Sequence, residues 1–600
     1  MARSKNASAN KAMGFLSRLR RDVRGNTLAI VAASMIPLIA LAGGGIDVSR
    51  MYLAKVRLQH ACDAGALAGR KAMGAGTWAQ TNPNPNTIAQ QFFDGNFKSG
   101  AYGTTNISRT YSENSGDVSG TASVIVPMTM MKFFGMPART MSVACDAQMQ
   151  LPNTDVMFVL DNTGSMLQKA NSGDPMSKID TLKNAVKCFY ESVAQLKTNG
   201  TCANTTSGSG VNSSSQIRFG FVPYTTNVNV GKLLPTSYFV DNWSYQSRQY
   251  VSTNASWSSS QTLGSNIPCN LVPSDSTNTD YTKTNNGNGT CTVSATSKVV
   301  WHYGQISVNV GALKNGTAWN SSFTLPIADD GANKTINWDG CIEERATVKT
   351  AGNPSDFTPI PSGAKDLDID MVPTSTGSTM WAPALPDLIY TRGGWSDSNW
   401  NNADMPSTTV PYLNGSNYYC PTAAKKLQTW SNPADFDAYV DSLFADGNTY
   451  HDIGLLWGAR LMSPTGLFAS ENALTPQGGQ IQRQMIFMTD GDTNTSKDDY
   501  AAYGVSWFDR RETTTAPPSN SDLDNQVNAR FAALCTATKN KGITLWVISF
   551  GGNGIAATTK ARLQACATDS NHYFDASSAA SLNSAFQLIA AQITQLRLTK

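Results

Sequence analysis

The sequence predicts an α/β fold, a doubly wound and mostly parallel sheet with a large β-rich insertion, preceded by a transmembrane helix and a small α+β domain. Two apolar runs, 156–160 and 485–488, each end in a loop that carries carboxylates, as buried parallel strands do at their C-terminal ends. Helix-like and strand-like patterns alternate around these runs. The 600 residues exceed one ordinary core, so two or three domains are expected.

The N-terminus carries a membrane signal. A basic tail, residues 1–24, precedes residues 25–47, whose uncharged stretch Thr27–Ile46 matches the ~20 residues needed to cross hydrocarbon. Positive charge before this stretch and little directly after it place the tail in the cytoplasm and the bulk outside. A cleaved signal peptide is the alternative, because Ala40-Leu41-Ala42 suits a signal peptidase. The basic residues of the tail are Arg3, Lys5, Lys11, Arg18, Arg20, Arg21 and Arg24.

Residues 48–150 predict a helix that leaves the membrane and packs on a small sheet. Apolar residues recur at helical spacing up to Met73. Strand-like alternation follows at 118–126 and 140–151, with a short helix expected at 128–134 between them. A small α+β domain is therefore expected directly after the membrane.

Residues 151–600 predict the α/β domain. Apolar and β-branched runs indicate strands, and amphipathic repeats indicate helices. Because the two alternate along the chain, parallel pairing is expected. Strands are expected at 156–160, 218–222, 484–489 and 543–550, and helices at 178–196, 451–462, 522–541 and 578–596.

Residues 232–431 interrupt this domain and are dense in Asn, Ser, Thr and Trp. An insertion of this length is expected to form its own small β-rich subdomain. Its tryptophans suit either surface recognition of glycans or a core with few aliphatic side chains. A stripe of carboxylates on a predicted strand suits either Ca²⁺ or a solvated face; it consists of Asp366, Asp368 and Asp370.

The polar loops after two of the predicted strands indicate a metal site. Their candidate ligands are all oxygens, without paired His or Cys, which favours a divalent hard cation, either Mg²⁺ or Ca²⁺. His451 lies near one of them and is expected on the surface of a helix N-terminus. The candidate ligands are Asp161, Thr163, Ser165, Thr449 and Asp490.

Three separate motifs, Asp161-x-Thr163-x-Ser165, the distant Thr449 and Thr489-Asp490-Gly491, together resemble the metal-ion-dependent adhesion site of von Willebrand factor type A domains. The resemblance implies that the three hydroxyls bind the ion. It also implies that the two Asp residues act directly or through water. A carboxylate from a partner protein would complete the shell.

A second resemblance covers the N-terminal part of the chain. Residues 24–30, 45–50 and 58–68 resemble the N-terminal region of TadG-like proteins, which belong to the tight-adherence (Tad) machinery that builds Flp pili. The resemblance implies a pilin-like N-terminal domain and partners among pilus-assembly or envelope proteins. A plain membrane tether is the alternative, since no Gly-x-x-x-x-Glu-Tyr processing signature is found.

Ten cysteines follow the membrane run, an even number that suits five disulfides in an oxidising compartment. A metal cluster is the alternative, but the sequence contains no Cys-x-x-Cys. The pairs we expect are Cys62–Cys145, Cys188–Cys202, Cys269–Cys291, Cys341–Cys420 and Cys535–Cys566.

Composition and motifs exclude several function classes. No basic stripe with interleaved aromatics supports nucleic-acid binding, and no nucleophile elbow, HExxH or phosphate loop supports catalysis. We therefore expect a non-enzymatic bacterial envelope protein, anchored in the inner membrane with its bulk in the periplasm, or in the outer membrane or at the surface. Metal-dependent adhesion in Flp pilus assembly is the leading hypothesis. A structural minor pilin-like or secretion-channel component is the alternative, and a metal-dependent hydrolase comes third.

Overall fold

The protein divides into two compact units. One unit is Met1–Gln150 together with Thr594–Lys600, and the other is Leu151–Ile593. The computed structural model describes residues 26–73, 78–79, 84–114, 117–149, 153–194, 216–253, 261–272, 274, 279–297, 299–328, 331–351, 357–390, 403–406, 417–476, 480–594 and 596–598. The predicted cytoplasmic tail, residues 1–24, lies outside them.

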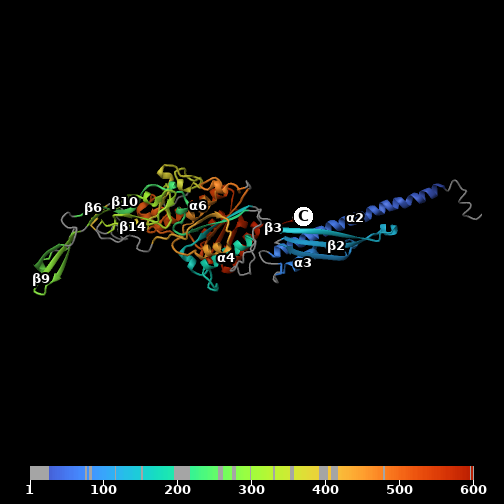
Figure 1. The fold of residues 1–600 in the computed structure, drawn as a ribbon, viewed down its shortest axis with the longest axis horizontal. Coiled ribbons are helices and arrows are strands. Elements are labelled where there is room, and N and C mark those ends of the chain that lie inside the picture. Colours follow the sequence, from blue (N-terminus) through green and yellow to red (C-terminus); the bar gives the residue numbers. More distant parts are fainter. Residues whose placement is uncertain are drawn as a thin grey trace, which may run out of the picture. The chain divides into compact units, whose positions relative to one another are not determined.

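The first unit is built on one long helix, α2 (Asn26–Met73), which includes Pro37 (Figure 1). The stretch Ile30–Ala72 is long and apolar enough to cross a membrane by length and composition. Its first half exposes large apolar side chains, whereas its second half packs into the core of the unit through Ala54, Leu58 and Ala61. The helix therefore has two environments, as the sequence predicted.

An antiparallel sheet covers the second half of α2. Its order is β1 (Thr105–Asn114), β2 (Asp117–Pro127), β3 (Ala138–Met149) and β24 (Leu596–Leu598), and helix α3 (Pro85–Asn96) also packs on α2. The strands predicted at 118–126 and 140–151 are confirmed. The sequence predicts that residues up to 600 belong to the α/β domain, but β24 pairs with β3, so residues 594–600 belong to the first unit.

The second unit contains a six-stranded sheet. Five neighbouring strands are parallel, and only the edge strand β18 is antiparallel. The order β18-β5-β4-β19-β22-β23 places the third, second, first, fourth, fifth and sixth strands of the sheet side by side. The strands are β4 (Thr154–Asp161), β5 (Ile217–Tyr224), β18 (Lys425–Gln428), β19 (Gln482–Thr489), β22 (Ile543–Phe550) and β23 (Tyr573–Ala576).

Helices cover both faces of this sheet. Because side chains alternate along a strand, Phe158 of β4 packs with one set of helices and Val159 with the other. The first set is α4 (Lys178–Val193), α5 (Pro433–Asp441) and α11 (Ala579–Ile593). The second set is α6 (His451–Met462), α9 (Asn520–Asn540) and α10 (Ala557–Cys566). The mixed α/β class is thereby confirmed.

The described part of the insertion is rich in short strands, as expected. One ladder is β17 (Ala403–Pro406), β10 (Val299–Asn309) and β6 (Asn242–Thr253), and another is β7 (Gln261–Pro268), β9 (Thr290–Ser297) and β8 (Thr279–Asn285). Two-stranded pairs are β11 (Lys314–Asn315) with β12 (Ala318–Trp319), β13 (Ser322–Leu325) with β14 (Lys334–Asn337), and β15 (Ile342–Glu343) with β16 (Ala382–Pro383). Later in the chain, β20 (Tyr500–Ala501) pairs with β21 (Gly504–Val505), and α7 (Ala469–Asn472) and α8 (Ser506–Asp509) are short helices.

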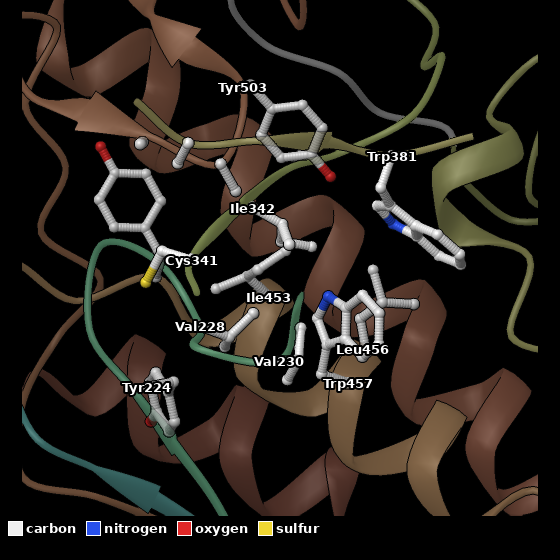
Figure 2. Close-up of a cluster of buried hydrophobic side chains, with 14 of the residues drawn as sticks. Tyr224, Val228, Val230, Cys341, Ile342, Trp381, Ile453, Leu456, Trp457 and Tyr503 are labelled. Carbon is white, nitrogen blue, oxygen red and sulfur yellow. The ribbon is translucent and has the colours of Figure 1, made fainter. Parts of the chain in front are cut away.

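The insertion shares a core with the sheet instead of closing a core of its own. Figure 2 shows two side chains of the insertion beside α6, Trp381 next to Trp457 and Ile342 next to Ile453. Trp301, Trp338 and Trp381 are buried, which supports the core interpretation of the tryptophans. The expected separate subdomain is therefore wrong for these residues, because α6 presents an apolar face that the insertion covers.

Buried ion pairs bind the insertion to helices α6 and α9. Nη1 of Arg460 lies 2.7 Å from Oε1 of Glu344, and Nε of Arg530 lies 2.9 Å from Oδ2 of Asp452. Arg530 also pairs with Asp366 of the insertion. We call this group the arginine cluster; its members are Glu344, Arg345, Asp366, Asp452, Arg460, Glu512 and Arg530, all buried.

The predicted carboxylate stripe is wrong. Asp366 lies in a 3-10 turn, Lys365–Leu367, and is buried in the arginine cluster. Asp370 instead accepts hydrogen bonds from Ser463 and Lys541, and Asp368 is exposed. The segment is a turn rather than a strand, so the three carboxylates do not share a face.

Four of the predicted disulfides are present. They are Cys62–Cys145, Cys269–Cys291, Cys341–Cys420 and Cys535–Cys566. The fifth prediction, Cys188–Cys202, involves Cys202, which lies outside the described residues. Within the described part of the chain, no cysteine is free.

Candidate metal centre

The loop after β4 gathers the first candidate ligands. Asp161 is the last residue of the strand, and its Oδ1 accepts a hydrogen bond from the backbone N–H of Thr163 at 2.9 Å. A 3-10 turn, Gly164–Leu167, then carries Ser165 back toward the strand end. The Oγ1 of Thr163 and the Oγ of Ser165 lie 3.1 Å apart.

The neighbouring strand β19 brings Asp490 to the same place. Ser165 Oγ donates a hydrogen bond to Oδ1 of Asp490 at 2.7 Å, although 325 residues separate them. β4 and β19 are adjacent and parallel, so their C-terminal ends coincide. The structure therefore brings together four of the five predicted residues.

Thr449 lies on the adjoining loop and forms no hydrogen bond with this cluster of four. The carbonyl of Gly447 accepts a hydrogen bond from the N–H of Gly164 at 2.9 Å, which joins the two loops. Gly447 has a φ of 80°, and a Cβ there would lie 2.6 Å from the ring of Tyr419. Among the described residues, Thr449 forms backbone hydrogen bonds with Asn494, and none joins its hydroxyl to the other four.

Asp161 is fully buried, and burial is the main cause that raises its pKa to about 7. The nearby carboxylate of Asp490 raises this pKa further. Thr489 partly offsets both effects, because its hydroxyl donates to Oδ2 of Asp161 at 2.8 Å. Two buried carboxylates that lie close together repel each other, so a positive charge beside them stabilises their ionised forms.

Lys178 supplies a positive charge that sequence reasoning missed. It is the first residue of α4, and its Nζ donates to Oδ2 of Asp490 at 2.8 Å. A positive charge in the first turn of a helix interacts unfavourably with the helix dipole. The position of Lys178 in the sequence therefore indicated that a carboxylate pairs with it. Lys178 therefore neutralises part of the site without any metal.

His451 was expected on the surface, but it is fully buried, so that expectation is wrong. Its Nε2 lies 2.9 Å from the hydroxyl of Thr489, and its Nδ1 lies 3.0 Å from that of Thr493. Burial lowers its pKa to about 3, so the ring is neutral. Because both nitrogens are engaged, His451 positions Thr489 and through it Asp161, and is not a metal ligand.

A hollow of about 560 Å³ adjoins the site. Lys178 reaches from this hollow to Asp490, and the backbone of Gly551 passes close to the carbonyl of Asp490. Lys178 lines the hollow, whereas none of the five candidate ligands does. It is lined by Gln168, Lys169, Ala170, Asn171, Lys178, Gly551, Gly552, Gly554 and Ser577.

A second group with metal-ligand side chains lies elsewhere in the same unit. Asp339, Cys341 and Cys420 have ligand atoms within 4.8 Å of one another. The two sulfurs are joined in a disulfide, so they are not available as thiolate ligands. This group is therefore structural.

Comparison with protein families gives one match. Residues 25–80 match the family described as "Putative Flp pilus-assembly TadE/G-like". No curated protein matches the chain. The likeness to this family is confined to the N-terminal segment, which includes the apolar helix α2.

Several pilus proteins have a weak structural likeness to the chain. The pilus adhesin SpaC of Lactobacillus rhamnosus GG has 10% identity and a TM-score of 0.28, over 81% of this chain and 34% of that one. The PilB minor pilin of Streptococcus sanguinis has 11% identity and a TM-score of 0.28, over 82% and 78%. The pilus adhesin RrgA of Streptococcus pneumoniae has 9% identity and a TM-score of 0.30, over 82% and 50%. The chain thus spans about a third of the length of SpaC, and we draw no conclusion from likenesses at this level.

Proposed function

We propose that this protein is a non-enzymatic component of Tad pilus assembly, anchored by α2 with its second unit on the outer side of the inner membrane. We propose further that the second unit is a von Willebrand factor type A-like domain. It would hold Mg²⁺ or Ca²⁺ through Asp161, Thr163, Ser165, Thr449 and Asp490, and bind a carboxylate of a pilus or envelope protein.

The observation that carries this proposal is the convergence of four side chains from two distant motifs. They lie at the C-terminal ends of adjacent parallel strands, where open α/β sheets bind ligands. The strand order, with an antiparallel edge beyond a parallel sheet, supports the type A-like assignment.

The residues present fit a hard cation. Every candidate donor is an oxygen, and the two carboxylates are buried beside each other. A bound cation would supply an electrophilic position for a partner carboxylate. The chain's own part is to hold Asp161 through Thr489 and to orient Ser165 against Asp490.

One observation favours the structural alternative. Lys178 already pairs with Asp490, and this ammonium can balance the site in a domain that needs no metal. The second unit would then be a structural part of the pilus machinery. The two proposals differ in whether a divalent cation stabilises the folded protein.

The test is thermal unfolding of the full chain in detergent, with EDTA, Mg²⁺ or Ca²⁺. A cation at ~100 times its dissociation constant should stabilise the domain by about 2.7 kcal/mol. Ser165→Ala and Asp490→Asn should remove this increment. A calorimetric titration of the same proteins would give the dissociation constant.

The matched control is Asp155→Asn. Asp155 is a buried carboxylate at the other end of β4, paired with Arg218 at 2.6 Å. Its loss should destabilise the domain and leave the cation increment intact. An increment that is absent in the wild type, or present in Asp490→Asn, would reject the metal centre.

A further inference from the structure

We propose that the turn between β2 and β3 inserts into the lipid interface beside α2, as a second membrane contact. We call residues 128–137 the β2–β3 tip. This inference rests on the proposed membrane crossing by α2 and is independent of the metal centre.

The tip presents large apolar side chains to solvent. Phe133 is 83% exposed and Phe134 is 45% exposed, while Met130 and Met136 are 36% and 37% exposed. Apolar side chains gathered in this way mark a surface that contacts lipid or protein. The 3-10 turn Met131–Phe134 holds the two aromatic rings in place.

Specific hydrogen bonds attach the tip to α2 where its uncharged stretch ends. Both carboxylate oxygens of Asp47 accept bonds from the tip, from the backbone N–H groups of Thr129, Met130 and Met131 at 2.8–2.9 Å. Arg50, one turn further on, donates to the hydroxyl of Thr129. Figure 1 shows the cyan end of the β2–β3 pair lying along the blue helix.

The contact extends into the apolar stretch itself. A Cβ on Gly43 would lie 2.5 Å from the Cβ of Met130, so only glycine permits this approach. Gly43 precedes Asp47 by four residues, which is about 6 Å of helix at 1.5 Å per residue. If α2 crosses the bilayer with residues 27–46, the tip lies at the depth where amphipathic segments insert, about 5–10 Å into the boundary of headgroups and acyl chains.

The charges around the tip also suit a lipid surface. Lys132 and Arg139 are exposed within and beside the apolar cluster. Their long side chains can reach phosphate headgroups while the rings of Phe133 and Phe134 remain among acyl chains. The occupant we infer is therefore the lipid bilayer, because continuity with the membrane-crossing stretch of α2 places the tip there.

The experiment uses the full chain in liposomes, with an environment-sensitive NBD probe on one introduced cysteine at a time. The positions are Phe133→Cys in the tip, Ile36→Cys in the exposed half of α2, and Phe92→Cys in α3. Phe92 is the matched control. It is 53% exposed, but α3 packs on α2 at Gly65 and Gly69, at least about 27 Å along the helix from Asp47.

Quenching of the probe by a nitroxide on lipid, or by iodide in the aqueous phase, then shows whether each position lies in lipid or in water. We expect lipid nitroxide to remove about half or more of the signal at positions 36 and 133, and iodide to quench position 92 alone. Quenching by lipid at position 36 but not at position 133 overturns the inference and leaves the anchor intact. If neither quencher reaches position 133, the tip contacts a protein partner, and the inference is overturned. If lipid nitroxide quenches neither position 36 nor position 133, the membrane anchor itself is rejected.

Discussion

The second unit holds two groups of buried charges that are built differently. In the arginine cluster, guanidinium groups face carboxylates on several sides, and tryptophan N–H groups complete the hydrogen bonds of Glu344. At the end of β4, Lys178 pairs with Asp490, whereas Asp161 accepts hydrogen bonds from Thr163 and Thr489. The first group joins the insertion to helices α6 and α9. The second has a single ammonium beside two buried carboxylates, a charge balance that a bound cation would improve.

The largest expected effect is in the arginine cluster. Arg530→Met would leave Asp366 and Asp452 buried without their cation, so we expect a loss of about 3–5 kcal/mol in the free energy of unfolding. Urea unfolding of the full chain measures it. Arg109→Met breaks the exposed pair with Asp94 and should cost less than about 1 kcal/mol. If both substitutions lowered the free energy of unfolding by the same amount, the arginine cluster would stabilise the protein no more than an exposed ion pair does.

Removing the lysine should have two opposite effects at the other site. In EDTA, Lys178→Met should lose about 1–3 kcal/mol, because Asp490 loses a charged hydrogen bond. With Mg²⁺ or Ca²⁺, the affinity should rise at least about tenfold, because a like charge no longer repels the ion.

The control for this prediction is Lys187→Met on the same helix. Lys187 pairs with the exposed Asp441, so its loss should change neither the cation affinity nor the unfolding free energy by more than about 0.5 kcal/mol. Unchanged affinity in Lys178→Met would show that the ammonium and a cation do not compete.

The pH dependence of cation binding gives a smaller effect. The pKa of Asp161 is raised to about 7, so below that pH a proton occupies the carboxylate and competes with the ion. Affinity should therefore rise with pH up to about 7 and level off above it, with a proton released on binding below that point. Titration calorimetry in two buffers of different ionisation enthalpy detects that proton. A flat profile from pH 5 to 8 would contradict the assignment of Asp161.

The smallest effect is expected at Asp370, a member of the carboxylate stripe that the sequence suggested. Its pair with Lys541 is partly exposed, so Asp370→Asn should cost less than about 1 kcal/mol. The response to Ca²⁺ should stay as in the wild type, in contrast to Asp490→Asn. If Asp370→Asn lost the response to Ca²⁺, this segment would be a calcium-binding site.

The predictable parts of the structure share one property, a local pattern. Helix α6 and strand β22 were predicted at 451–462 and 543–550, where the structure has them, because runs of apolar residues mark them directly. Helices α5 and α10 were missed, since α10 has only three buried residues and no clear apolar stripe. The motif residues around Asp161 and Asp490 were found for the same local reason.

Long-range pairing of charges could not be predicted in this way. Lys178 lies 312 residues from Asp490, and Arg530 lies 164 residues from Asp366. In sequence, both resemble ordinary solvated charges on helix surfaces. Only the packing of the sheet and insertion reveals which of them are buried.

The position of β24 has a consequence for synthesis of the protein. The sheet of the first unit gains its last strand only when residues 596–598 have been made, after the whole second unit. A chain that stops early leaves β3 with an unpaired edge, which is a template for aggregation. The edge of β3 is therefore covered by its neighbour only late in synthesis, after the strands of the second unit have been made.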